Sequence, residues 1–217
     1  MYLYVTKMTE TLEEVELLLN RSSRQLKKPE RIHYRFLKDR LMHQLGDALI
    51  QYAIEQCAGL TPKEWEYHIT TMGKVEIRSS CHIYVSISYS YPYIVCIIDN
   101  QPIGIDIEEM KDLDYKYLAK NFTTNEFNQV TTLKDFYEIW TKKESYTKLI
   151  GEGLMNGLDC YDVTQNLRFL KKHVQFTSVD YFKRLIQICH MSKHSLNFEV
   201  VPLTPVSYTH LTLPTIC

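Results

Sequence analysis

The sequence lacks any long hydrophobic run, any close cysteine pair and any excess of charge of one sign. No stretch approaches the roughly 20 apolar residues of a membrane span, and residues 1–10 have no apolar signal-peptide core. The six cysteines have neither C-x-x-C nor zinc-type spacing, so they favour unpaired thiols in a reducing compartment over a disulfide framework. A net charge of −1 gives no general attraction to nucleic acid or to membranes. We therefore expect a cytoplasmic protein that binds neither.

The pattern of helices and strands excludes a classical nucleotide-binding fold, because the chain has no β-α-β alternation and no glycine-rich loop. Apolar spacing predicts helices over residues 9–19, 29–58, 123–133 and 135–150, and a short one from Thr61-Pro62. Pro29 suits the first turn of the long helix, and Gly59 and Gly151 suit helix ends. β-rich runs predict strands over residues 1–5, 83–98 (interrupted near 91–92) and 103–108. The predicted fold class is α+β.

The last twelve residues, 206–217, read VSYTHLTLPTIC. They resemble a translated sequencing adapter more than a biological C-terminus. We expect a non-native tail and exclude it, with His210 and Cys217, from site reasoning.

The strand predicted at 103–108 reads IGIDIE and places two carboxylates on one face, because alternate residues of a strand share a face. Asp106 and Glu108 would lie about 6.6 Å apart and repel each other by about 2 to 3 kcal/mol at an effective dielectric near 20. A hard cation such as Mg²⁺, which also takes substrate phosphates, would relieve that repulsion. Gly104 on the same face would leave room for a ligand. The alternative is an edge strand with a solvated outer face.

The helix predicted at 135–150 contributes a third carboxylate and a lysine. Glu144 and Lys148 lie four residues apart and so share a face, on the shoulder of the apolar stripe beside Trp140. Partial shielding there would strengthen their electrostatics. The alternative is an ordinary surface ion pair.

Together, IGIDIE (103–108) and WTKKESYTK (140–148) resemble the paired signature of the 4′-phosphopantetheinyl transferases. Three further segments are similar to motifs of the larger, surfactin-type members, and the resemblance runs over most of residues 1–205. These segments are RLMHQLGDAL (40–49), Gly73-Lys74 and VSISYSYPYIVCIID (85–99).

The resemblance implies two similar α+β halves, residues 1–100 and 101–205, packed as a pseudo-dimer within a monomer, with the active site in the cleft between them. It implies a holo-[acyl-carrier-protein] synthase type enzyme. Such an enzyme transfers the 4′-phosphopantetheine of coenzyme A to a serine of an apo-acyl or peptidyl carrier protein, with Mg²⁺, and releases adenosine 3′,5′-bisphosphate.

By the same resemblance, Asp106, Glu108 and Glu144 would bind the metal, and Lys148 would contact the coenzyme A phosphates. Two candidates for the base that accepts the serine proton remain open, Glu144 and Glu126. Glu126 also completes a capping box with Thr123, which is its structural alternative.

Lys74 and Ser88 match positions that hold coenzyme A, although either could be an ordinary turn or strand residue. Tyr89 stands where the family has a histidine that binds the nucleotide, and it carries no positive charge. Tyr89 therefore raises a second possibility, a weak relative that binds coenzyme A or a carrier protein without efficient turnover. Lys143 points to the core side and receives no chemical role.

A third possibility is an unrelated metal-binding protein. His190 and His194 lie four residues apart and could act as ligands if their segment were helical. No glutamate follows His190, and the segment reads as a strand and loop.

Overall fold

A computed structural model of the chain describes residues 1–21, 26–27, 34–153 and 157–202. The predictions for Pro29 and for the tail at 206–217 lie outside these residues. Among the described residues, no helix combines the length and the apolar character that crossing a membrane requires.

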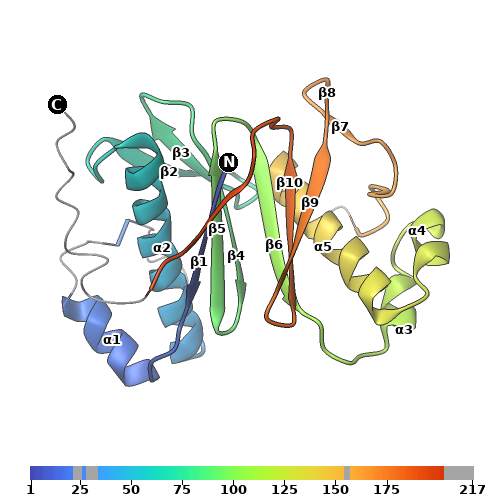
Figure 1. Cartoon of the computed structure of the whole chain (residues 1–217), viewed down its shortest axis with the longest axis horizontal. Helices are drawn as coiled ribbons and strands as arrows, with labels where there is room; N and C mark the ends of the chain where they lie inside the picture. Colours follow the sequence, from blue (N-terminus) through green and yellow to red (C-terminus); the bar gives the residue numbers. More distant parts are fainter. Residues whose placement is uncertain (22–25, 28–33, 154–156, 203–217) are drawn as a thin grey trace.

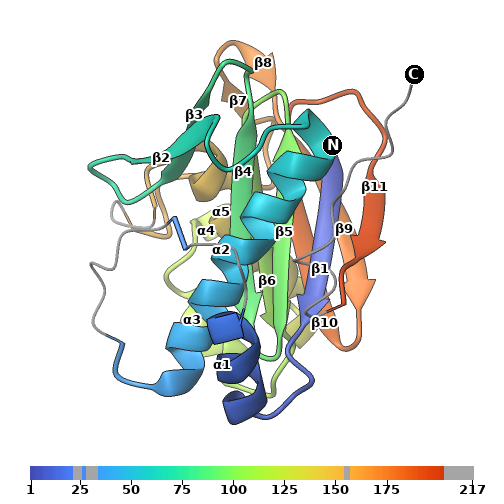
Figure 2. The same ribbon diagram turned by 90° about the vertical axis from the view of Figure 1, so that its left-hand side faces the viewer.

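Two antiparallel-rich sheets lie between two long helices (Figure 1), which confirms the α+β class. The first sheet has the order β11 (Asn197–Val200), β1 (Tyr2–Lys7), β5 (Tyr93–Asp99), β4 (Tyr84–Ser90). The second has the order β6 (Ile103–Glu109), β10 (Arg184–His190), β9 (Gln175–Tyr181). Helix α2 (Leu37–Ala58) covers the first sheet, with α1 (Leu12–Arg21) beside it, and α5 (Leu133–Ile150) covers the second. Figure 2 shows α2 crossing the first sheet diagonally.

The two sheets repeat one order of elements. Strand β1, helix α2, hairpin β2 (Trp65–Ile69)–β3 (Val75–Ser79), β4 and β5 follow one another in the first part of the chain. Strand β6, helix α5, hairpin β7 (Arg168–Phe169)–β8 (Lys172–His173), β9 and β10 follow in the second. In each part, the first strand pairs antiparallel with the last, and the last with the one before it. Strand β11 departs from this scheme, since it adds to β1 in parallel.

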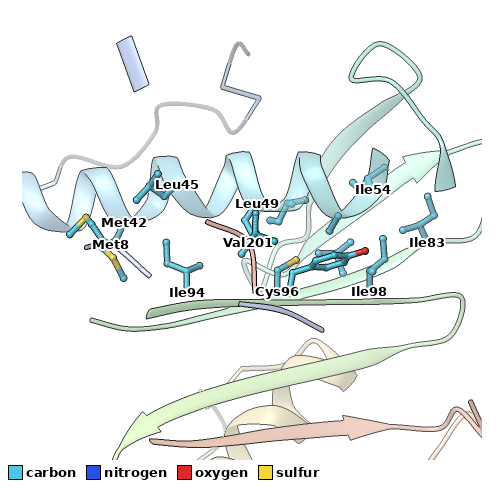
Figure 3. Packing of buried hydrophobic residues seen from close by; sticks show 14 of the residues in the cluster. Met8, Met42, Leu45, Leu49, Ile54, Ile83, Ile94, Cys96, Ile98 and Val201 are labelled. Atoms are coloured by element: carbon cyan, nitrogen blue, oxygen red, sulfur yellow. The ribbon is translucent and has the colours of Figure 1, made fainter. Parts of the chain in front are cut away.

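Apolar side chains on both faces of the sheets hold the layers together. Leu45, Leu49 and Ile54 of α2 pack against Ile94 and Cys96 of β5 (Figure 3). The opposite face of β5 meets the inner face of β6, and every residue of β5 is buried. Strand β6 contributes Ile103, Ile105 and Ile107 to that inner core, as its alternation predicts.

Most predicted elements are present, and the differences lie at their ends. Gly59 and Gly151 end α2 and α5 in the left-handed region, with φ of 64° and 86°, as expected. The long helix begins only at Leu37. The helix expected over 123–133 is the shorter α4 (Thr124–Gln129), and α3 (Tyr115–Ala119) precedes it without having been predicted.

The short helix predicted from Thr61-Pro62 is wrong. Glu64 accepts hydrogen bonds from the Thr61 amide and hydroxyl at 2.7 and 2.6 Å, which closes a single turn. The chain then enters the β2–β3 hairpin, in which the side chains of β3 alternate between half-buried and exposed and Trp65 of β2 is buried. Both strands, WEYHI and VEIRS, alternate apolar and polar residues, so a strand signal was present there and the helix start expected at Thr61-Pro62 obscured it.

Gly104 makes close packing between β6 and α5 possible, and the expectation that it leaves room for a ligand is wrong. A Cβ atom at this position would lie 1.9 Å from the Ser145 carbonyl oxygen and 2.7 Å from the Leu149 nitrogen. Both are backbone atoms of α5, so the helix itself fills the space.

Gly104→Ala should therefore destabilise the chain by about 3 kcal/mol, because a helix backbone cannot yield locally. Urea unfolding would measure the loss. Ile105→Val on the same strand serves as a control and should cost only about 1 kcal/mol. Equal stability of Gly104→Ala and the unsubstituted chain would contradict the described contact.

Candidate active site

The candidate site lies where β4, β6 and α5 meet. Lys148 of α5 donates to Asp106 Oδ1 of β6 at 2.8 Å and to Ser88 Oγ of β4 at 2.9 Å. Ser88 also donates to Asp106 Oδ1, at 2.8 Å. One oxygen of Asp106 is thus shared by Ser88, 18 positions earlier in the chain, and by Lys148, 42 positions later. Lys148 pairs across the layers with Asp106, whereas the alternative drawn from the sequence was an ordinary surface ion pair with Glu144.

Asp106 is buried, and its second oxygen has no hydrogen-bond partner among the described residues. A buried acceptor without a donor is unfavourable by about 1 to 3 kcal/mol. An unsatisfied carboxylate oxygen next to a cation is therefore a feature that folding alone does not account for, and it suits a ligand.

Glu108 lies two residues further along β6 and accepts a hydrogen bond from Trp140 Nε1 at 3.3 Å. Burial raises the pKa of Glu108, and the negative charge of Asp106 raises it further. The indole N–H of Trp140 and the charge of Lys148 act in the opposite direction. The mutual repulsion expected from the D-x-E spacing is therefore present.

Glu144 completes a set of three mutually interacting carboxylates. Burial raises its pKa to about 7, with further contributions from Asp106 and Glu108, while Lys148 lowers it. A carboxyl group that titrates near neutral pH can hold or release a proton under physiological conditions.

These carboxylates do not form a ready-made metal cluster. Within the described ranges, no three His, Cys, Asp or Glu side chains are arranged so that they could hold a metal ion. The ammonium group of Lys148 is the cation next to Asp106 in this structure.

A cavity of about 230 Å³ opens beside this network. One wall comes from the first part of the chain, including Lys74 and the start of β4, and the other from the end of α5, including Lys148 and Gly151. Lys74 donates to the Leu149 carbonyl at 2.7 Å, and burial lowers its pKa. Two lysines from opposite parts of the chain thus line one cavity, where the sequence placed Lys74 and Lys148 on coenzyme A phosphates.

The side chain of Tyr89 points away from the site, although the side chain of its neighbour Ser88 contacts Asp106. Its ring packs with the α2-facing core, 4.9 Å from the ring of His43. A Cβ added to Gly46 would lie 2.2 Å from the Tyr89 hydroxyl, so this tyrosine occupies space next to the helix. Successive residues of a strand point to opposite faces, which explains the separation. The place of Tyr89 at the position of the family's nucleotide-binding histidine therefore stays a prediction from the motif.

Glu126 also lies elsewhere, and its geometry agrees with the structural alternative, the capping box, rather than with the role as base. It is fully buried, closes the capping box with Thr123, and accepts from the Val163 amide at 2.8 Å. The Lys143 ammonium lies 2.6 Å from its other oxygen and also donates to the Tyr161 carbonyl. Both oxygens of this fully buried carboxylate are occupied by donors of the chain itself, which leaves no open position for a substrate hydroxyl. Lys143, which the sequence left without a chemical role, is the partner in this buried ion pair.

The metal-site alternative built on His190 and His194 is not supported by the structure. Both ring nitrogens of His190 are engaged, with Thr177 Oγ1 at 3.0 Å and with the Ser192 carbonyl at 3.1 Å. His194 lies outside the strand that carries His190, 3.8 Å from Asp99.

Sequence reasoning missed Thr147 and Gly151, which line the cavity on either side of Lys148 in sequence. Their position next to Lys148, on the last turn of the helix and just beyond it, was the available signal. The cross-layer partnership of Ser88 with Asp106 had no local signal, since it joins two strands that are not hydrogen-bonded through their backbones.

Glu144→Gln should stabilise the chain at pH 8 and have little effect at pH 4. The folded pKa of about 7 lies above the ordinary value of 4.5, so the stability that protonation provides is complete below about pH 4.5 and lost as the pH rises through 7. Because Glu144 is partly solvated, we expect a gain of only about 1 kcal/mol at pH 8. Urea unfolding at the two pH values would measure it.

The matched control is Glu138→Gln on the same helix, whose carboxylate is 39% exposed and lies 3.8 Å from the Lys134 ammonium; its substitution should change stability by less than about 0.5 kcal/mol. A loss of stability in Glu144→Gln at both pH values would contradict the strain attributed to this carboxylate.

Comparison with known proteins shows to which family the chain that carries this site is related. The profile described as "4'-phosphopantetheinyl transferase superfamily" matches residues 102–198, the segment from β6 to β11. A 4′-phosphopantetheinyl transferase of Bacillus subtilis is 30% identical over 166 residues, which cover 74% of this chain and 73% of the relative.

Two further relatives carry the same designation. The transferase gsp of Aneurinibacillus migulanus is 30% identical over 141 residues and is covered to 59%. The transferase Sfp of Bacillus subtilis strain 168 is 32% identical over 125 residues and is covered to 56%. Asp106, Glu108, Glu144 and Lys148 all lie within the matched family segment. The chain belongs to the 4′-phosphopantetheinyl transferase superfamily and is similar to its surfactin-type members.

Proposed function

We propose that this chain transfers the 4′-phosphopantetheine group of coenzyme A to a serine of an apo-acyl or peptidyl carrier protein, the holo-carrier-protein synthase reaction. One observation carries the proposal: the Asp106–Lys148–Ser88 network lies beside a cavity that presents Lys74 and Lys148 together. This arrangement offers cations for phosphates next to a carboxylate with an unsatisfied oxygen. The names of the relatives agree with it.

Coenzyme A would bind with its nucleotide phosphates in the cavity. Lys74 would lie on one side of the phosphates and Lys148 on the other, each able to donate charge-assisted hydrogen bonds. Lys74 would exchange its bond to the Leu149 carbonyl for a phosphate oxygen.

The residues also suit Mg²⁺. This ion is usually held by one or two carboxylates together with substrate phosphates, so a complete protein cluster is not expected before coenzyme A binds. Asp106, with its unsatisfied oxygen, Glu108 and Glu144 would hold it. When bound, Mg²⁺ would neutralise charge on the pyrophosphate as a Lewis acid.

In the transfer step, the serine oxygen attacks the phosphorus that bears the pantetheine, and the bond from that phosphorus to the oxygen of adenosine 3′,5′-bisphosphate breaks. The serine proton passes to a carboxylate oxygen of Glu144, the carboxylate of α5 that faces Asp106 and Glu108. Lys148 stabilises the negative charge that develops on the leaving phosphate. Glu126 has no part in this step.

We also propose that the two parts of the chain form a pseudo-dimer, residues 1–100 and 101–205, with the active site in the cleft between them. The repeated strand order and the two-sided lining of the cavity support this division. A monomer would then carry a complete site. The comparisons do not favour the alternative of a relative without turnover.

Asp106→Ala should abolish transfer, since it removes the oxygen shared by Lys148 and Ser88. Mass spectrometry of an apo-carrier protein, after incubation with this chain, coenzyme A and Mg²⁺, should show a gain of one phosphopantetheine with the unsubstituted chain. Asp106→Ala should reduce the rate by at least about 100-fold.

Asp112→Ala, an exposed carboxylate shortly after β6, is the control and should transfer normally. Transfer by Asp106→Ala at the normal rate, with its dependence on Mg²⁺ retained, would overturn the assignment of this site. Absence of transfer by the unsubstituted chain to both acyl and peptidyl carriers would overturn the proposed function.

A further inference from the structure

Two strand turns lie side by side at one end of the molecule, the β4–β5 turn and the β9–β10 turn (Figure 1). Arg184 joins them, with one guanidinium nitrogen donating to the Tyr91 carbonyl at 2.8 Å and another to the Phe182 carbonyl at 3.2 Å. Arg184 is only 7% exposed and also pairs with Glu109 at 3.3 Å. The two turns and the end of β6 are therefore held as one rigid unit.

This unit presents aromatic side chains to solvent. Phe182 is 70% exposed, Tyr91 50% and Phe198 of β11 45%. The half-buried ring of Tyr181 links Phe182 and Phe198, since its centre lies 4.8 Å from that of Phe182 and 5.7 Å from that of Phe198. We call these three exposed residues, with the exposed Lys7, Lys38 and Lys183, the tip surface.

The backbone at the β9–β10 turn makes the exposed phenylalanine harder to explain by folding alone. Phe182 and Lys183 have φ of 46° and 60°, in the left-handed region. Two-residue turns of this kind favour Asn and Gly, and a bulky side chain is disfavoured there. Leu170 in the β7–β8 turn shares this backbone and exposure. What distinguishes Phe182 is its setting, because its ring stacks on Tyr93 and meets the edge of Tyr181 in an aromatic cluster that stays open to solvent.

Charge defines the kind of partner. Lys38 lies 5.1 Å from the ring centre of Tyr91, and Lys7 lies 5.6 Å from that of Tyr93, so cations border the exposed rings. Glu109 at the end of β6 is already paired with Arg184 and Lys111. The exposed Asp39 and Asp180 leave the three lysines in excess. A second copy of this chain, docked through the same surface, would bring lysines against lysines. An acidic partner with apolar side chains is complementary.

The position of the tip surface along β4 selects the carrier protein among acidic partners. Val85, Ser86 and Ile87 line the cavity, Ser88 contacts Asp106, and Tyr91 lies in the tip surface. The order along the strand is therefore cavity, carboxylates, tip surface. In a phosphoryl transfer, the attacking oxygen enters opposite the leaving group. With the nucleotide in the cavity, the serine would arrive from the tip end.

We propose that the tip surface is the docking site for the carrier protein. The carrier would bind through an acidic, partly apolar surface of its own, next to its substrate serine. This proposal rests on the proposed function. Phe182 inserts into the apolar part of the partner, the three lysines face its carboxylates, and Arg184 keeps the surface in register with β6.

The test compares Phe182→Asn with Leu170→Asn. Leu170 is a matched control, because it is 66% exposed, has a φ of 48° and precedes Lys171 in the β7–β8 turn just as Phe182 precedes Lys183. Asparagine suits the left-handed region, so both variants should fold. Steady-state kinetics would use an acidic apo-acyl carrier domain and an acidic apo-peptidyl carrier domain, with direct binding to each domain measured in parallel.

Phe182→Asn should raise KM for the carrier about tenfold and weaken direct binding to the same extent, with KM for coenzyme A unchanged. Leu170→Asn should change neither. An unchanged carrier KM and unchanged binding in Phe182→Asn would overturn the docking site, as would an equal effect of both variants.

Two further outcomes are distinguishable. Self-association of the unsubstituted chain in sedimentation, abolished by Phe182→Asn, would overturn the carrier as occupant in favour of a second copy. Carrier binding that is lost in Phe182→Asn, without any transfer by the unsubstituted chain, would support the docking site while overturning the proposed function. Absence of both binding and transfer would overturn both.

Discussion

The site depends on how closely α5 approaches β6. Only a residue without a side chain beyond Cα can lie at position 104, since the Ser145 carbonyl occupies the place of a Cβ. This contact fixes the rotation and the height of the helix over the strand. It thereby sets Lys148 against Asp106 and holds Trp140 within reach of Glu108. A helix held a little further from the strand would leave the same residues on the same faces and separate the groups that interact.

The electrostatics of the site follow from this packing. Asp106, Glu108 and Glu144 are drawn together under partial burial, and Lys148 is the cation that acts on all three. Burial and mutual repulsion raise the pKa of Glu108 and Glu144, so the site favours an additional positive charge. A chain selected for stability alone would not gather charges in this way. The buried pair of Lys143 and Glu126, with every oxygen of Glu126 satisfied, is the contrasting case in which charge is held for structure.

Local sequence patterns predicted which residues face the site better than which residues bond to one another there. The alternation of IGIDIE gave both the buried face of β6 and the carboxylate face, because a strand has a fixed period of two. Helical spacing placed Glu144 and Lys148 together, yet Lys148 bonds to Asp106 and Ser88, which only the packing of α5 across two strands could determine. Tyr89 was assigned to the site from its motif alone, while the strand period turns its ring toward α2. The β2–β3 hairpin was missed because Thr61-Pro62 favours a helix start, although WEYHI and VEIRS both alternate apolar and polar residues.

The most direct test of a single site built from both parts of the chain is calorimetric titration of coenzyme A into Lys74→Met and Lys148→Met in the presence of Mg²⁺. These lysines come from the β2–β3 hairpin region and from α5, and they line one cavity. We predict that either substitution weakens coenzyme A binding by about tenfold or more, since each removes a charge-assisted bond to the same phosphates. Normal binding by Lys74→Met alongside weakened binding by Lys148→Met would contradict a site shared between the two parts.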